Sequence, residues 1–236
     1  MTYPYLNNTH EKIETLLMKY KIDATPDQKN NLTFIMEKTL AFNNSLNWDQ
    51  SIGEVFLPKT VDELFEIYML RSQVYGKLNY DKEFPDSIQG LNFDLYDTCS
   101  AILYTKANAK MTGTCRVIFD SDTKLPMDKN FSLDYMREEN KHLVELSRLM
   151  IERECKGLGQ EPKLLTKGTY EVMKKNGKTT MVSVMVHEHF KLYDKFGGFS
   201  IESELKTYGT LSIPFIITSW EIDQISPFFK KVFLAV

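Results

Sequence analysis

The spacing of hydrophobic residues changes along the chain and separates an N-terminal helical segment from a longer mixed segment. Between residues 9 and 50, apolar side chains recur every three or four positions, which is typical of the buried face of an α-helix. A proline directly after Thr25 suits the first turn of a second helix. We therefore expect two helices in an N-terminal extension over residues 1–50, followed by a main domain over residues 51–236.

The main domain begins with a short strand and a capped helix. Residues 53–57 predict a strand that ends before a proline. Thr60 and Glu63 have the spacing of a capping box, in which each side chain accepts a hydrogen bond from the backbone N–H of the other residue. The helix that they open should end near Leu78. Residues 79–96 lack a clear period and predict a long loop.

From residue 100 onward, alternating and helical periods follow one another. The predicted strands cover residues 100–106, 111–119, 143–151, 179–186, 199–205 and 212–220, and the predicted helices cover residues 133–140, 161–175 and 187–196. A hairpin followed by strand–helix–strand order favours one mixed sheet covered by helices. We therefore predict an α/β fold, of the α+β mixed-sheet type, with both antiparallel and parallel neighbours.

Composition limits the classes of function. The 236 residues are 42% hydrophobic and 26% charged, with a net charge of −3, as in soluble globular proteins. No long block of like charge indicates a nucleic-acid partner or a polybasic membrane anchor. The N-terminus lacks the pattern of a signal peptide, and the apolar residues 211–220 are too few to span a bilayer. We expect a cytoplasmic protein with no integral membrane segment.

Cysteine and histidine positions favour neither disulfides nor a metal centre. The three cysteines have no CxxC spacing, which fits a reducing compartment. His187 and His189 are two residues apart, so they would lie on different faces of the predicted helix. We expect no metal site.

The predicted strand 143–151 carries two charged residues within an apolar run. Glu145 and Arg148 are costly inside such a strand unless they are paired or used, and an ordinary surface ion pair explains them equally well. Three residues apart, they face opposite sides of a regular strand. A β-bulge between them would bring both into one cleft and would free a backbone N–H near Leu149 or Met150.

Four other charged residues are candidates for the same site. Arg71 lies on the capped helix, four residues before Tyr75, and Arg116 interrupts an apolar strand, where it requires an anionic partner. Asp94 and Asp97 in the long loop suit a helix cap, a cation-binding patch or half of a metal site. A surface arginine and a solvated turn are the structural alternatives for the helix and the loop.

A glycine-rich loop joins the strand 143–151 to the next helix. Lys156, Gly157 and Gly159 combine a positive charge with backbone N–H groups near a helix start, which favours a phosphate group. The loop is too short for a P-loop and is not G-x-G-x-x-G, so a nucleoside triphosphate or a dinucleotide is disfavoured. An ordinary turn is the alternative.

The order of strand, glycine loop, helix and strand resembles the GNAT acyltransferase superfamily, whose loop reads Arg/Gln-x-x-Gly-x-Gly/Ala. Here Glu154 stands at the Arg/Gln position. The charged residues extend the resemblance to the autoinducer-synthase branch, which includes acyl-homoserine-lactone synthases and long-chain N-acyl amino acid synthases. The motifs that carry it lie between about Gly53 and Leu205 and are Arg71-x3-Tyr75, Tyr80, Asp94-x2-Asp97, Gly113-x2-Arg116, Leu125-Pro126 and Glu145-x-Ser147-Arg148.

This resemblance implies a GNAT-like central mixed sheet flanked by helices, and an N-acyltransferase. The enzyme would move a fatty acyl group from a thioester to the primary amine of an amino acid or an amino-acid-derived acceptor. Glu145 would bind the ammonium or relay its proton, with Arg148 and Asp94 as further catalytic residues. The residues implied to position the substrate are Arg71, Asp97, Arg116 and Tyr75.

The resemblance also implies the donor. No tightly bound cofactor is expected; the donor would be the phosphopantetheine thioester of an acyl-carrier protein, or else acyl-coenzyme A. Glu154 favours the carrier protein, whose arm presents one phosphate rather than three, and the implied arm-binding residues are Lys156, Gly157 and Gly159. The acyl chain would need an apolar tunnel, and the candidates, which plain core packing also explains, are Met150, Met181, Val184, Met185 and Phe190.

Two other functions stay open on the sequence. The first is a GNAT-like fold that binds a partner without turnover, which Glu154 in the phosphate loop favours. The second is an ordinary coenzyme A-dependent acetyltransferase.

Overall fold

The computed structural model describes residues 4–49, 54–152, 160–207, 209, 211 and 213–234. These residues form a seven-stranded sheet with the order β1-β2-β3-β4-β5-β7-β6. The strands are β1 (Val55–Phe56), β2 (Ser100–Ala107), β3 (Lys110–Phe119), β4 (Leu143–Ile151), β5 (Thr180–Val186), β6 (Phe199–Leu205) and β7 (Phe215–Glu221). β4 and β5 are parallel, and the other neighbours are antiparallel. The prediction of a mixed sheet is therefore confirmed.

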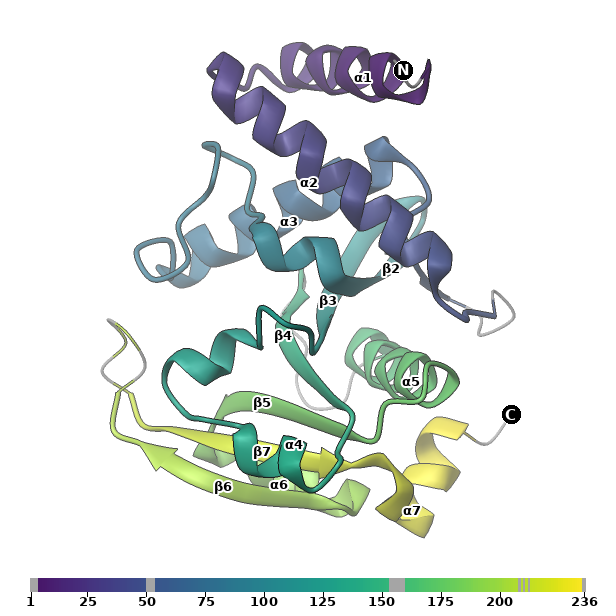
Figure 1. Cartoon of the computed structure of the whole chain (residues 1–236), viewed down its shortest axis with the longest axis vertical. Coiled ribbons are helices and arrows are strands. Elements are labelled where there is room, and N and C mark those ends of the chain that lie inside the picture. Colours follow the sequence, from purple (N-terminus) through teal and green to yellow (C-terminus); the bar gives the residue numbers. More distant parts are fainter. Residues whose placement is uncertain are drawn as a thin grey trace.

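Helices pack around this sheet, with three of them at the N-terminal end of the molecule (Figure 1). The helices are α1 (Pro4–Tyr20), α2 (Pro26–Ser45), α3 (Val61–Leu78), α4 (Asp134–Glu138), α5 (Gln160–Lys175), α6 (His187–Tyr193) and α7 (Pro227–Phe229). Short 3₁₀ turns cover Leu95–Cys99, Pro126–Lys129, Asp194–Phe196 and Ile222–Gln224, and a π turn covers Lys230–Leu234. The capping box is present at the start of α3, where Thr60 and Glu63 exchange backbone-to-side-chain hydrogen bonds.

The elements predicted from residue 100 to residue 205 appear with ends shifted by a few residues at most. The last strand begins at Phe215, not at residue 212, which lies outside the described residues. The short α7 was not predicted; it begins after Ser226, whose hydroxyl accepts a hydrogen bond from the N–H of Phe229. No helix in the described parts of the chain is both long and apolar enough to cross a bilayer.

Both faces of the sheet are covered by apolar side chains. One cluster lies between α1, α2, α3 and the strands, and it includes Phe65 and Met150. A second cluster lies under α5 and α7 and includes Leu165 and Trp220. Because β4 contributes to both clusters, its sequence is an apolar run rather than an alternating pattern.

Asn43 on α2 attaches the N-terminal helices to the edge of the sheet. β1 pairs with β2 at Tyr104 and Thr105, and no strand among the described residues pairs with the start of β2 on that side. The Asn43 side chain takes the place of the missing strand: its amide donates to the carbonyl of Ser100 at 2.9 Å, and its oxygen accepts from the N–H of Ile102 at 2.9 Å. Asn43 is fully buried, so water cannot replace either bond.

We expect Asn43→Ala to lower the free energy of unfolding by about 3 kcal/mol, because it leaves two buried backbone groups of β2 without partners. Asn44→Ala is the matched control. Asn44 is exposed, and its side-chain oxygen accepts a hydrogen bond from the Lys59 ammonium. Urea unfolding followed by circular dichroism measures both variants. Equal midpoints for the two would contradict this role of Asn43.

Candidate active site

A β-bulge in β4 places the consecutive side chains of Ser147 and Arg148 on the same face of the sheet. Ser147 pairs with Arg116 of β3, and Met150 pairs with Thr114, so Arg148 and Leu149 together face the single residue between them. Arg148 has a left-handed backbone, with φ +52°. The Ser147 hydroxyl accepts from Arg116 Nε at 2.9 Å, and Arg148 reaches the same side. The bulge that would bring Glu145 and Arg148 to one face, left open on the sequence, does occur, at Arg148 and Leu149.

Three arginines and two aspartates form one alternating chain of ion pairs below α3. Arg71 Nη1 of α3 donates to Asp97 Oδ1 at 2.8 Å. Arg116 Nη1 of β3 donates to Asp97 Oδ1 at 3.3 Å and to Asp94 Oδ1 at 2.6 Å. Arg148 Nη2 of β4 completes the chain on Asp94 Oδ2 at 2.6 Å. The structure thus brings together five residues that come from three elements and one loop.

The two aspartates also shape the turn that carries them. Asp94 is the N-cap of the 3₁₀ turn Leu95–Cys99: its side chain accepts from the N–H of Tyr96, and Asp97 accepts from the N–H of Asp94. Both carboxylates therefore have fixed rotamers before any substrate binds. No group of three or more metal-ligand side chains is gathered among the described residues, and here the aspartates pair with arginines instead.

Charge is unevenly balanced in this cluster. Burial alone would raise the pKa of Asp94, but the guanidinium groups of Arg116 and Arg148 hold it well below its usual range. Burial alone would lower the pKa of Arg116, but Asp94 and Asp97 raise it. By formal charge, three arginines face two aspartates in the cluster. The cluster has one positive charge in excess for another anion.

Glu145 lies two residues before Ser147 on β4 and is next to this cluster. Its side chain is buried, with 6% of the residue exposed. Burial raises the pKa of Glu145 to about 7, against the opposing effects of a hydrogen bond from the N–H of Met127, 2.8 Å long, and of the positive charge on Arg116. A carboxyl with a pKa close to neutrality can both accept and return a proton under physiological conditions.

Arg148 keeps hydrogen-bonding capacity that the protein does not use. Its Nε and Nη1 are buried and have no partner among the described residues, as is also true of Arg71 Nε and Nη2. Arg71 is completely enclosed, whereas the Arg148 side chain is 8% exposed and lies over the Tyr75 ring, 5.9 Å from its centroid. Tyr75 stacks in turn on Phe84 of the long loop. Arg148 is therefore the most exposed of the three arginines in the cluster.

The structure places the predicted residues in two groups. The gathered residues are Glu145, Arg148, Asp94, Arg71, Asp97, Arg116 and Tyr75. The predicted phosphate-loop residues Lys156, Gly157 and Gly159 lie outside the described residues. Sequence reasoning missed Met127, because it contributes a backbone N–H that no side-chain pattern reveals.

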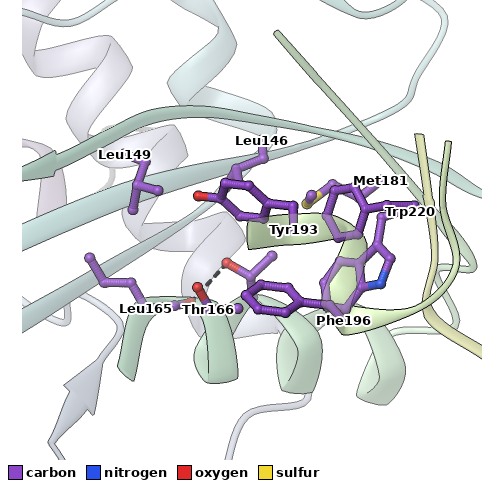
Figure 2. A pocket seen from close by; sticks show the side chains of 10 residues that line it. Leu146, Leu149, Leu165, Thr166, Met181, Tyr193, Phe196 and Trp220 are labelled. Atoms are coloured by element: carbon purple, nitrogen blue, oxygen red, sulfur yellow. Dashed lines mark hydrogen bonds between the residues drawn. The ribbon is translucent and has the colours of Figure 1, made fainter. Parts of the chain in front are cut away.

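An apolar pocket lies on the opposite face of β4, against α5. Figure 2 shows Leu146 and Leu149 of β4 on one side and Leu165 and Thr166 of α5 on the other, with Tyr193 between them. Trp220 and Phe196 are at one end. Its free volume is about 10 Å³, roughly enough for one water molecule.

This pocket differs from the tunnel expected on the sequence. Met181 lines it, but Met150 belongs to the cluster beneath α3, and Val184 packs with the cluster beneath α4. Met185 and Phe190 pack beside it without lining it. Alternation along β4 and β5 separates these apolar residues onto two faces, so they cannot share one tunnel.

Comparisons with known proteins identify the family and the fold of the chain. A family model for the N-acyl amino acid synthase FeeM matches residues 66–220. The solved structure of FeeM, an N-acyl amino acid synthase from uncultured soil microbes, has a TM-score of 0.57 at 17% identity, over 72% of this chain and 95% of its own. No curated protein sequence matches the chain significantly.

Two coenzyme A-dependent acyl-homoserine lactone synthases share the fold. BjaI has a TM-score of 0.52 at 14% identity, over 69% of this chain and 77% of its own. MesI has a TM-score of 0.52 at 13% identity, over 74% of this chain and 89% of its own. These likenesses confirm the GNAT-like mixed sheet that the resemblance implied.

The family model covers more than half of the chain, and the chain therefore belongs to the FeeM family of N-acyl amino acid synthases. It is an acyltransferase.

The buried carboxyl of Glu145 should make stability depend on pH. Its pKa is near 4.5 when unfolded and about 7 when folded, so the folded state is favoured below pH 4.5 and loses up to about 3 kcal/mol as pH rises through 7. We expect Glu145→Gln to be more stabilising, relative to the parent protein, at pH 8 than at pH 5.

Chemical unfolding at both pH values measures this difference. The exposed Glu138→Gln variant is the control and should show no such dependence. If Glu145→Gln changed the free energy of unfolding equally at pH 5 and pH 8, the carboxyl would not be held neutral by burial.

Proposed function

We propose that this protein transfers a fatty acyl group from a thioester to the α-amine of an amino acid or an amino-acid-derived acceptor. The observation that carries the proposal is the pairing, on one face of β4, of a buried carboxyl with a pKa of about 7 and an arginine with unused donors. The first group suits proton transfer from an amine, and the second suits a carboxylate. An α-amino acid presents both groups two bonds apart.

Proton transfer is assigned to Glu145. The acceptor amine must be neutral to attack, so its ammonium proton is lost to solvent first. The nitrogen lone pair then forms the N–C bond at the thioester carbonyl, and the ionised Glu145 carboxylate takes one proton from that nitrogen, directly or through one water. The C–S bond breaks, and Glu145 gives this proton to the leaving sulfur. Glu145 is ionised again at the end. Direct transfer of this kind needs no acyl-enzyme.

Arg148 is assigned to the acceptor carboxylate. Its Nη2 is held by Asp94, which fixes the guanidinium plane, while Nε and Nη1 keep N–H groups without a partner among the described residues, from which a carboxylate can accept. The excess positive charge of the cluster favours an anion at this position. Arg71, Asp97 and Arg116 hold Asp94 and so act as positioning residues.

The thioester is assigned to the opening between β4 and β5. These parallel strands pair only from Leu143 to Leu146 and from Thr180 to Ser183, although both continue further. Beyond that point, the same bulge, formed by Arg148 and Leu149, offers backbone N–H groups that can stabilise the developing oxyanion. The acyl chain would enter the apolar pocket from Leu149, the neighbour of Arg148, by displacing side chains that now fill it.

For the donor we propose the phosphopantetheine arm of an acyl-carrier protein, with acyl-coenzyme A as the alternative. The support is the sequence of the loop that follows β4, where Glu154 is unfavourable to the additional phosphates of coenzyme A, while Lys156, Gly157 and Gly159 suit a single phosphate.

We expect the purified protein to release free thiol from acyl-carrier-protein thioesters when amino acids are present. A panel of chain lengths, assayed with a thiol reagent and by mass spectrometry of the products, identifies both substrates. Glu145→Gln should lower turnover by about 100-fold or more, because it removes the proton acceptor. Absence of thiol release with every chain length, from carrier protein and coenzyme A alike, would refute the acyl-transfer proposal.

Arg148→Lys should raise KM for the amino-acid acceptor by about tenfold or more, because lysine keeps the positive charge but lacks the planar N–H groups that hold Asp94 and the carboxylate together. KM for the thioester should stay within about twofold. The matched control is the same acceptor without its carboxylate, for which Arg148→Lys and the parent protein should perform alike. If Arg148→Lys impaired both acceptors equally, the carboxylate would bind elsewhere.

A further inference from the structure

A second ion-pair cluster lies between α4 and the end of β3. Arg137 of α4 binds two carboxylates with one guanidinium: Nε and Nη2 donate to Asp120 at 2.7 and 2.8 Å, and Nη1 and Nη2 donate to Asp128 at 2.8 and 2.7 Å. Asp134 adds a contact at the exposed rim. Most of the Arg137 side chain is buried, at 22% exposed, and Asp128 is 9% exposed. The geometry is doubly bidentate, which only arginine can provide.

Asp128 passes this restraint to the backbone around it. Its two oxygens accept from the N–H of Leu125 at 3.0 Å and from the N–H of Leu133 at 3.1 Å. These bonds close the segment from Leu125 to Leu133 around the 3₁₀ turn Pro126–Lys129. The side chains of Leu125 and Met127 are buried in the hydrophobic core, so core packing holds the turn as well.

The same turn carries the hydrogen bond to Glu145. The N–H of Met127, one residue before Asp128, donates to Glu145 Oε2 at 2.8 Å. No other hydrogen bond to the Glu145 carboxylate is found among the described residues. A continuous set of bonds thus connects the Arg137 guanidinium through Asp128 and the turn to the proposed proton acceptor.

We propose that Arg137 and Asp128 are positioning residues for Glu145, because they hold the Met127 N–H against its carboxylate. The inference rests on the proposed function for the role of Glu145, but the geometry of the bonds does not. The Met127 N–H fixes the carboxylate orientation and stabilises its ionised form. Without the guanidinium, the turn would be released and this donor would move away.

The groups that face Glu145 set the direction of the expected change. Arg116 from β3 favours its ionised form, while Asp128 from the turn and Asp94 from the long loop oppose it. Loss of Arg137 leaves the charge of Asp128 uncompensated and weakens the bond from Met127. Both effects favour neutral Glu145, so its titration midpoint should move upward.

The test is titration of the full-length protein labelled with ¹³C at the glutamate carboxyl carbons, with the Glu145 resonance identified by its loss in Glu145→Gln. We expect Arg137→Met and Arg137→Lys both to move the midpoint upward. Arg137→Lys keeps the positive charge and loses only the two-carboxylate geometry, so it separates positioning from charge. Lys124→Met, which removes only the exposed contact to Asp134, is the control and should leave the midpoint unchanged.

A turnover assay provides a second readout. The acid limb of kcat against pH should move with the NMR midpoint, with activity at pH 6 falling about tenfold in Arg137→Lys while KM for the thioester stays unchanged. A folded Arg137→Lys protein with the parent midpoint would overturn the proposal and leave Arg137 a stabilising residue only. Because the NMR titration needs no turnover, a protein that transfers no acyl group would refute the proposed function without deciding this one.

Discussion

Three arginines share one buried region, and the two carboxylates between them make this arrangement possible. Arg71 and Arg116 meet at Asp97, and Arg116 and Arg148 meet at Asp94. Without these anions, three desolvated like charges would repel one another and the fold would have to expose them. The turn Leu95–Cys99 is therefore held at three points, by α3, β3 and β4.

This arrangement explains why the site is organised before a substrate arrives. The three arginines come from different elements and bind shared carboxylates, so their side chains have little rotational freedom. Binding of a substrate therefore costs little further side-chain entropy. Glu145 lies beside this cluster, where the positive charge on Arg116 favours its ionised form and burial favours its neutral form. A carboxyl poised between these two influences changes its proton with a small change in surroundings.

Local signals made most of the fold predictable. The capping box at Thr60 and Glu63 depends on residues three apart, the limits of β4 follow from a largely apolar run, and those of β6 follow from apolar residues that mostly alternate with polar ones. The short α7 gave no such signal, since three residues cannot show a helical period.

The sequence predicted which side chains gather at the candidate site, but not how they pair. Arg116 within an apolar strand signals that a partner exists, but tertiary packing decides that Asp94 and Asp97 both serve it. The bulge was inferred because Glu145 and Arg148 would otherwise face opposite sides. Its exact residue could not be inferred, since arginine carries no preference for a left-handed backbone. The hydrogen bond from the Met127 N–H to Glu145 could not be predicted, because almost every residue has a backbone N–H.

The left-handed backbone of Arg148 has a consequence for anyone who redesigns this protein for robustness. A side chain with a Cβ costs about 1 kcal/mol or more in that conformation, so glycine is the residue that the local backbone would choose. A procedure that selects for thermal stability alone would tend to replace the arginine to which the proposed function assigns the acceptor carboxylate. Under that proposal activity and stability compete at one residue, and the position must be held fixed in any such optimisation.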